Sequence, residues 1–555
     1  MTPRRTSAAE AGAAVAAGAA VAPGATSLRF VLVTMDSHLA SAAARVGRTL
    51  ARKVPGLSLA VHAATEWGQD ERALARCRGD IAAGDIVVAT MLFMEEHFQP
   101  VIDALAARRD HCDAMVCAMS ASEVMKLTRM GKFSMDGSGG GALSFLKKLR
   151  GKPEATSDEP GARASAGAKQ MRMLRRLPRI LRFIPGTAQD VRAYFMTLQY
   201  WLAGSEQNIG AMVEFLVDRY AAGPRRGLRG RAKPPEPVEY PEVGVYHPRL
   251  QHPRAAGRLA GTLAALPQVA TPGTRGTVGL LLMRSYLLAG NAAHYDGVIT
   301  AMEARGLRVL PAFATGLDSR PAIEAFFFAE GRPTIDALVS LTGFSLVGGP
   351  AYNDARSAED MLARLDVPYL SVTPVEFQTL DQWGASSRGL LPVEATMMIA
   401  IPELDGATGS MVFGGRGSAA HPVCTGCAHG CRFENSDSGH DMQSCIERAD
   451  MLAARVGRLV DLRRSGRASR KVAAIVFNFP PNAGNTGTAA FLGVFESLFN
   501  TLAAMQREGY SVEMPASVDA LRDRLLKGNA ERLGTPANVH ARVAVDDHVR
   551  REKHL

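Results

Sequence analysis

Two stretches of this chain alternate short apolar runs with amphipathic segments, and this alternation restricts the fold more than any other feature. The apolar runs have the length and composition of buried strands, and the segments between them have helical spacing. The predicted strands are Arg29–Met35, Leu57–Ala63, Asp85–Met94, Ala114–Met119, Thr277–Met283, Leu307–Phe313, Ile335–Phe344 and Val367–Thr373. The pattern predicts a multidomain α/β protein of parallel, Rossmann-like sheets with helices on both faces.

Changes in composition mark the expected domain boundaries. The chain has 555 residues, 47% of them hydrophobic, which is enough for two to four domains. The expected parts are a disordered Ala/Gly tail (1–27), an N-terminal α/β domain (28–135), a flexible insert (136–168), a helical segment (169–222), a Pro/Arg-rich linker (223–241), a second α/β domain (242–420), a Cys-rich loop (421–445) and the start of a further domain (446–555).

The formal charge of +10 is compatible with nucleic acid, a membrane surface or an acidic ligand. No nucleic-acid module is present, and no apolar run reaches the eighteen residues of a membrane span. Arginines gather on one side of a helix predicted over Lys169–Gly186, which could contact an anionic membrane peripherally. A solvated helix on the protein's own core is the preferred interpretation. Four of the seven cysteines are clustered, unlike a secreted disulfide framework, so we expect a cytoplasmic protein.

Polar and turn-forming residues follow several predicted strands, where ligands bind in parallel sheets. In the first region they are Asp36, Ser37, His38, Glu95, Glu96 and His97; in the second they are Arg284–Tyr286, Gly316–Asp318 and Thr342–Phe344. Helix caps and ordinary loop chemistry explain any one of them equally well. We expect the second group to meet at one edge of its sheet.

The cysteine cluster is the strongest chemical signal. Cys424, Cys427, Cys431 and Cys445 have the spacing C-x2-C-x3-C-x13-C. Two thiolates in C-x2-C can hold one metal centre, and the other two complete a four-thiolate set. The pattern predicts a [4Fe-4S] cluster, or alternatively zinc, and His421, His429 or His440 could replace a thiolate. A redox disulfide and free thiols remain open alternatives.

A strand, a small-residue loop and a helix are predicted over Lys471–Met505, with the strand at Val472–Phe477. Backbone N–H groups at such a helix N-terminus suit a polar ligand group, although the Lys-Ser/Thr ending of a nucleotide loop is missing. Two further guesses concern Arg416 in a Gly-rich turn, as an anion contact, and Glu403 in a polar turn after Met397–Ile401. The candidate substrate-binding residues are Asn482, Asn485, Thr486, Thr488, Arg416 and Glu403.

Several long segments resemble the large (H) subunit of magnesium chelatase, to which the large subunit of cobaltochelatase is related. They are FNFPPNAGNTGTAAFLGVFESLFNTL (Phe477–Leu502), SASEVMKLTRMGKFSM (Ser120–Met135), Pro374–Gly406 and Val412–Gly417. The resemblance implies ATP-dependent insertion of Mg²⁺ into protoporphyrin IX at the start of (bacterio)chlorophyll biosynthesis. It also implies two smaller partner subunits, an AAA+ ATPase and its co-subunit, which supply the ATP hydrolysis.

The resemblance runs from about Phe30 to Leu555, yet members of that family are about twice as long. Their second half carries a His-Phe-Gly-Thr-His-Gly type motif with a nearby glutamate, which this sequence lacks. We therefore expect the N-terminal half of such a subunit, as a fragment, a truncated product or a short relative, and no catalytic residue can be assigned. A cobaltochelatase relative and a non-catalytic tetrapyrrole carrier or redox sensor are the alternatives.

Overall fold

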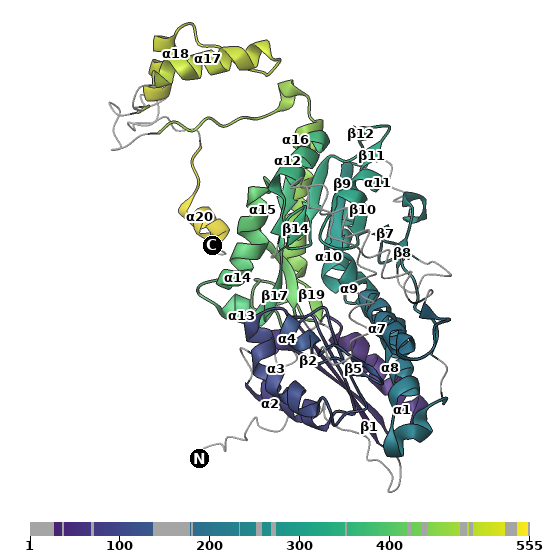
Figure 1. Ribbon diagram of the computed structural model, residues 1–555. Coiled ribbons are helices and arrows are strands. Elements are labelled where there is room, and N and C mark those ends of the chain that lie inside the picture. The colour runs from purple at the N-terminus through teal and green to yellow at the C-terminus, as the bar shows by residue number, and fades with distance from the viewer. Residues whose placement is uncertain are drawn as a thin grey trace, which may run out of the picture. The chain divides into compact units, whose positions relative to one another are not determined.

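The structure is a computed structural model (Figure 1). It describes residues 27–35, 38–67, 71–136, 178, 181–231, 234–250, 258–267, 274–349, 352–418, 423–433, 441–477, 486–487, 492–527 and 541–552. The chain divides into two units, Met1–Arg455 and Val456–Leu555. The predicted α/β class is confirmed, because the two largest sheets are built around parallel strands with helices between them.

The first sheet has the strand order β2-β1-β3-β4-β5-β6. Its first four strands are parallel and its last two are antiparallel. The strands are β1 (Leu28–Thr34), β2 (Leu57–Ala63), β3 (Ile86–Thr90), β4 (Ala114–Ala118), β5 (Arg129–Met130) and β6 (Phe133–Ser134). The four strands predicted in this region are therefore confirmed.

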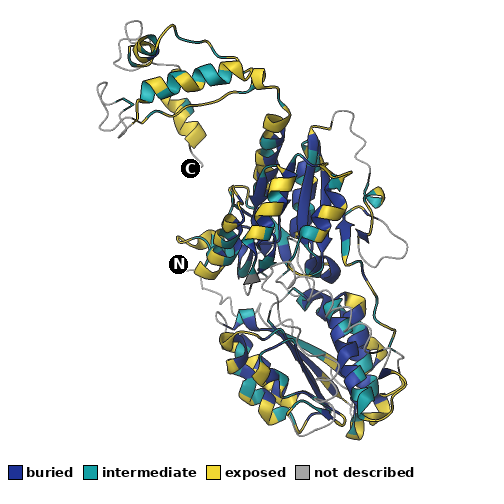
Figure 2. Cartoon of the chain, turned by 45° about the horizontal axis from the view of Figure 1, so that its top comes forward, coloured by how far each residue is buried: buried dark blue, intermediate teal, exposed yellow. Residues whose placement is uncertain are grey.

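Side chains on β1 alternate between two cores, because successive residues of a strand point to opposite faces. Phe30 and Leu32 join one core with helices α1 (Ala40–Lys53), α7 (Thr187–Leu202) and α8 (Glu206–Tyr220). Val31 and Val33 join the other core with α2 (Glu71–Ala83) and α3 (Glu95–Arg108). Figure 2 shows the dark-blue strands between helices whose outer faces are yellow. The other short elements here are η1 (Ala64–Glu66), α4 (Ser122–Met125) and η2 (Gly223–Leu228).

The second sheet repeats this plan with the order β16-β13-β9-β10-β7-β8. Strands β9, β10, β13 and β16 are parallel, and β7 and β8 are antiparallel. The strands are β7 (Val243–Tyr246), β8 (Leu259–Ala260), β9 (Gly276–Met283), β10 (Leu307–Ala314), β13 (Ala337–Ser340) and β16 (Tyr369–Ser371). The neighbouring helices are η3 (Leu263–Ala265), α9 (Arg284–Ala289), α10 (Ala293–Ala304), α11 (Arg320–Phe326) and α12 (Ala355–Leu365). Two short pairs are β11 (Phe328–Ala329) with β12 (Arg332–Pro333), and β14 (Gly348–Gly349) with β15 (Tyr352–Asn353).

A third, three-stranded sheet carries the cysteine region. Strand β18 (Val412–Arg416) is parallel to β17 (Thr373–Thr379) and antiparallel to β19 (Met442–Ser444). The associated helices are α13 (Leu380–Ala385), α14 (Pro392–Ala395), the π-helical turn η4 (Thr396–Ala400), α15 (Ile401–Leu404) and α16 (Ile446–Arg464). No helix in the described part of the chain combines the length and the apolar character needed to cross a membrane.

The second unit contains the strand prediction that was wrong. Residues 471–477 form no strand, and Ile475 and Phe477 are 97% and 67% exposed. A strand needs a neighbour for its backbone hydrogen bonds, and none of the described strands pairs with this run. The helix predicted after it is present as α17 (Val494–Arg507), followed by α18 (Val518–Leu526) and α20 (Val545–Glu552), with η5 (Arg467–Ser469) before it.

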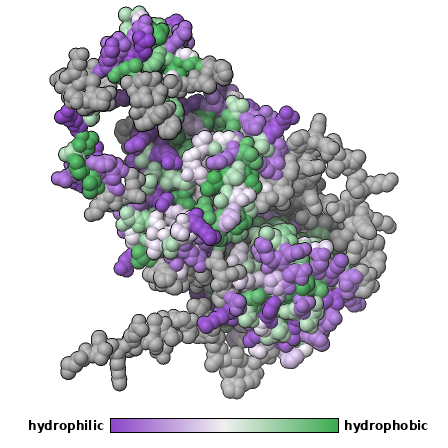
Figure 3. All heavy atoms as spheres, turned by 90° about the vertical axis from the view of Figure 1, so that its left-hand side faces the viewer, coloured by the Kyte–Doolittle hydropathy of each residue, from purple (hydrophilic) through white to green (hydrophobic). Residues whose placement is uncertain are grey.

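Few side chains are buried in the second unit. After α16, Leu521 is the buried apolar side chain among the residues described there. Figure 2 shows its helices in teal and yellow, and Figure 3 shows apolar and polar side chains interspersed on its surface. A unit with so little buried apolar surface opens at low free-energy cost.

Limited trypsin digestion is expected to cut first, among the described residues, between Arg463 and Lys471. Residues 466–469 are exposed, and residues 471–477 lie outside regular structure, so little must unfold before the protease binds. Mass spectrometry of the early fragments locates the cut. Replacing Arg467, Arg470 and Lys471 by glutamine should slow it, whereas an earlier cut at Arg308 within β10 would contradict the expectation.

Candidate functional site

Residues predicted at the edge of the first sheet belong mainly to a helix start. Glu95 and Glu96 are exposed in the first turn of α3, where negative charge is favourable, and His97 is buried in the same turn. The backbone carbonyl of His38 accepts a hydrogen bond from Asn291 Nδ2 at 3.3 Å. Asp36 and Ser37 lie outside the described residues. This favours the helix-cap interpretation for α3.

The loops after the parallel strands of the second sheet do meet, as expected. Met283, Gly316, Leu317, Thr342 and Phe344 all line one pocket. Its volume of about 10 Å³ is that of roughly one water molecule. The predicted gathering is thus confirmed for the loops after β10 and β13, whereas Arg284–Tyr286 do not line this pocket. The loops close on one another and leave no room for a large ligand there.

Arg284, which follows the first strand of this group, is buried and turns away from that pocket. Its guanidinium donates to the backbone carbonyls of Pro241 at 2.9 Å and Tyr240 at 3.3 Å. Asp318 forms an ion pair with Arg320 at 2.8 Å. Both side chains therefore hold loops in place.

The acidic turn after Met397–Ile401 differs from the expectation, because Pro402–Leu404 belong to helix α15. Glu403 is exposed on this helix, whereas Asp405 is buried. Asp405 accepts hydrogen bonds from Ser345 Oγ at 2.6 Å and from the Leu346 backbone N–H at 2.8 Å. Burial raises the pKa of Asp405. Sequence reasoning selected the solvated acid and missed the one that anchors the loop after β13.

Arg416 ends β18 and is buried. Its guanidinium donates to the Glu376 carbonyl at 3.2 Å and lies 3.7 Å from Glu66. It is therefore engaged with protein groups and not presented to solvent. Of the predicted loop residues, Asn482, Asn485 and Thr488 lie outside the described residues, and Thr486 is half-buried.

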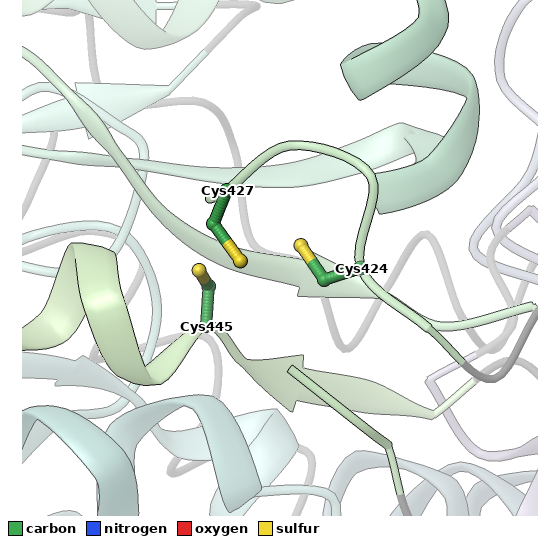
Figure 4. Close-up of side chains that lie close together, drawn as sticks. All are labelled: Cys424, Cys427 and Cys445. Atoms are coloured by element: carbon green, nitrogen blue, oxygen red, sulfur yellow. The ribbon is translucent and has the colours of Figure 1, made fainter. Parts of the chain in front are cut away.

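The cysteine cluster is where the structure brings predicted residues together. The sulfur atoms of Cys424, Cys427 and Cys445 all lie within 4.8 Å of one another. They point toward a common centre in Figure 4. Cys431 Sγ lies 3.5 Å from Cys427 Sγ. Three of the four thiols are buried and Cys427 is half-buried.

Local contacts explain why the cysteine side chains of this loop lie close together. A β-bridge joins Val423 to Arg432, and the Cys424 N–H donates to the Cys431 carbonyl at 2.8 Å. This folds the C-x2-C-x3-C segment back on itself. Cys445 comes from a distant position, between β19 and the first residue of the 19-residue helix α16. The positive end of that helix acts against the Cys424 hydrogen bond and the burial that together raise the pKa of Cys445.

The thiols also interact electrostatically. The hydrogen bond from Cys445 lowers the pKa of Cys424, and the same hydrogen bond raises the pKa of Cys445. Burial raises the pKa of Cys427. The Cys445 thiol thus stabilises the charged form of Cys424. His429 is turned away, because its Nδ1 lies 2.6 Å from Glu447 Oε2; His421 and His440 are outside the described residues.

Gly426 lets the cysteine loop pack against α13. A Cβ at this position would lie 2.2 Å from the Trp383 ring. The guanidinium of Arg448 lies 4.5 Å from the centre of that ring, and its Nε donates to the Gly426 carbonyl at 3.1 Å. The tryptophan cannot move without breaking these contacts.

Gly426→Ala is therefore expected to destabilise the first unit by about 1–3 kcal/mol through overpacking. Urea unfolding followed by tryptophan fluorescence, to which Trp67, Trp201 and Trp383 of the first unit contribute, measures the change. Gly466→Ala is the matched control, since no atom lies within 4 Å of its added Cβ and its backbone has a negative φ. Equal stability of the two variants would show that the loop adapts freely.

Comparison with known proteins shows which family the chain belongs to. Residues 198–555 match the family described as CobN/Magnesium Chelatase, and residues 29–195 match a domain of unknown function, DUF3479. The chain belongs to the CobN/magnesium chelatase family. It is 50% identical over 516 residues to the magnesium-chelatase H subunit of Cereibacter sphaeroides. These residues make up 93% of this chain and 42% of that protein. The resemblance stated from the motifs is confirmed.

More distant members of the family are also similar. The aerobic cobaltochelatase protein CobN of Sinorhizobium sp is 25% identical over 358 residues, which is 63% of this chain and 26% of that protein. The solved "Catalytic Subunit of Cobaltochelatase from Mycobacterium tuberculosis" has a TM-score of 0.47 at 20% identity. The match covers 91% of this chain and 33% of the solved chain. The chain spans less than half the length of these relatives.

Proposed function

We propose that this chain acts in a magnesium chelatase as part of the large, porphyrin-binding subunit. The supporting observation is the 50% identity over 93% of the chain to a magnesium-chelatase H subunit. The 25% identity to a cobaltochelatase protein over a shorter span favours magnesium over cobalt. The proposed reaction is ATP-dependent insertion of Mg²⁺ into protoporphyrin IX in (bacterio)chlorophyll biosynthesis, in the cytoplasm.

The chemistry explains why several subunits are proposed. Mg²⁺ releases its hydration water reluctantly, and the macrocycle must lose two pyrrole protons. Binding the tetrapyrrole in a site that excludes water is the role proposed for the large subunit. The AAA+ ATPase and its co-subunit would couple ATP hydrolysis to insertion.

The loop with Asn482, Asn485, Thr486 and Thr488 remains our candidate for contact with the tetrapyrrole. Glu403, exposed on α15, remains a second candidate. Arg416 is better placed to position Glu66 and the Glu376 carbonyl than to bind a ligand itself.

Reconstitution tests the proposal. The purified chain is mixed with the two ATPase subunits, Mg²⁺, ATP and protoporphyrin IX, and the fluorescence of Mg-protoporphyrin is followed. Product formation that requires the chain supports a chelatase role. A parallel titration with Co²⁺ and a cobaltochelatase substrate distinguishes the cobalt alternative.

Porphyrin binding is measured separately by quenching of protoporphyrin fluorescence on addition of the chain alone. Quenching without Mg-porphyrin formation would contradict the enzymatic proposal and favour a tetrapyrrole carrier, for which the thiol cluster offers a redox-sensitive element. Absence of both signals would overturn the tetrapyrrole proposal altogether.

A further inference from the structure

We propose that Cys424, Cys427, Cys431 and Cys445 bind one divalent metal ion of the zinc class, and not an iron–sulfur cluster. This site is separate from the Mg²⁺ that a chelatase handles as substrate. The inference does not depend on the proposed function, because it rests on the geometry of the four thiols.

Sulfur–sulfur distances distinguish the two occupants. Four thiolates arranged tetrahedrally around one ion at about 2.3 Å lie about 3.8 Å from one another. The sulfur atoms of Cys424, Cys427 and Cys445 lie within 4.8 Å of one another. Cys431 is outside that group, although its sulfur is 3.5 Å from that of Cys427, so its side chain must shift to complete the set. A [4Fe-4S] cluster places a cube of iron and sulfide between its cysteines, so their sulfur atoms must stand much further apart.

The surroundings suit thiolates as ligands. Cys424, Cys431 and Cys445 are between 0% and 6% exposed, so water would not displace them from an ion. Cys445 immediately precedes the first residue of α16 and so brings a sulfur from a second element to the loop. Arg448 holds the loop in place through the hydrogen bond from its Nε to the Gly426 carbonyl.

The loop is held in this shape by contacts other than the sulfur atoms. The Val423–Arg432 bridge closes it, Thr425 Oγ1 donates to the Asp381 carbonyl at 3.1 Å, and Gly426 rests on Trp383. Such contacts bring the ligands together before the ion binds, which lowers the entropic cost of binding. A bound ion would link the loop, the N-terminus of α16 and, through Trp383, helix α13.

The site is tested by metal analysis of the full chain purified without oxygen. We expect elemental mass spectrometry of the acid-digested protein to give a metal content of about one zinc ion per chain. Replacing that ion by Co²⁺ should give the intense visible absorption of tetrahedral cobalt thiolate. Iron together with labile sulfide, a disulfide within the cluster, or a metal-free protein with four alkylatable thiols would each overturn the proposal.

Serine variants assign the ligands. Cys427→Ser, at a half-exposed position that the fold tolerates, should lose the metal and the cobalt absorption. Cys112→Ser is the matched control: this buried thiol donates to the Arg109 carbonyl far from the cluster, and the variant should keep the ion. Cys431→Ser should weaken binding and shift the cobalt spectrum. Unchanged binding in Cys431→Ser would overturn the four-thiolate assignment.

Discussion

Lowering the pH from 7 to 4 is expected to cost the protein about 3 kcal/mol of folding free energy through His294 alone. His294 lies on α10 and is completely buried, and neither ring nitrogen has a hydrogen-bond partner among the described residues. Its ring lies 3.7 Å from that of Tyr295 and stacks on Phe413 at 5.9 Å. Burial in these aromatic surroundings lowers the pKa of His294 to about 3.

The direction of the effect follows from proton binding. The unfolded chain binds a proton at this histidine near pH 6.5, whereas the folded chain does not until about pH 3. The unfolded state therefore gains free energy as the pH falls below 6.5, and the contribution of a neutral His294 to stability is progressively lost. The loss of stability continues until the pH reaches the pKa of His294 in the folded chain, about 3.

Urea unfolding of the native chain and of His294→Phe at pH 7, 6, 5 and 4 measures this contribution. Phenylalanine keeps the ring stacking and cannot be protonated, so the stability of the native chain relative to the variant should fall by about 3 kcal/mol between pH 7 and pH 4. Carboxyls with raised pKa, such as Asp296 and Asp405, act in the opposite direction, but they are the same in both proteins and cancel in the difference. Parallel pH profiles would show that His294 is not buried in neutral form.

Glu394→Ala is expected to destabilise the first unit by about 3–5 kcal/mol. The Glu394 side chain is fully buried on α14. One carboxylate oxygen accepts hydrogen bonds from the backbone N–H groups of Glu376 and Phe377 at 3.2 and 3.0 Å. The other oxygen accepts hydrogen bonds from Gln378 Nε2 at 2.6 Å and from the Leu391 backbone N–H at 3.2 Å. Alanine would leave these buried donors without an acceptor, and each such donor costs about 1–3 kcal/mol.

Two further variants make the measurement specific. Glu394→Gln keeps the size of the side chain but turns one acceptor into a donor that faces other donors, so an intermediate loss is expected. Glu324→Ala is the exposed control: its ion pair with Arg364 is more than half exposed on both sides, and its removal should cost less than about 1 kcal/mol. A loss in Glu394→Ala no larger than in this control would show that water replaces the carboxylate.

Strands inside the two large sheets could be predicted from sequence because their signal is local. Leu57–Ala63 was predicted with the same bounds as β2, and Leu307–Phe313 differs from β10 by one residue. β10 is apolar on both faces except at Arg308, because helices cover both sides of the sheet, whereas β2 is a partly buried edge strand. The same signal failed at Val472–Phe477, since composition cannot show whether a neighbouring strand is present to pair with it.

Some features of the candidate site could likewise be predicted from the sequence, and others could not. The spacing of Cys424, Cys427 and Cys431 predicted that thiols of one loop lie close together, and Cys427 is close to both of the others. The sequence did not show that Arg416 contacts Glu66, or that Glu403 is exposed while Asp405 is buried. His294 and Glu394 carry the largest expected effects and were not selected at all, because nothing in their immediate sequence shows that they are buried.

The sequence by itself determined the α/β class, most strand positions, the thiol-rich loop and, through its motifs, membership of the chelatase family. These depend on residue type and spacing within short segments, which local sterics and hydrophobic periodicity control. Only the tertiary structure decided how close the sulfur atoms lie, which acids are buried, and that Val472–Phe477 forms no strand. Burial, distance and strand pairing depend on segments far apart in the chain, such as Cys445 arriving at the loop from the start of α16.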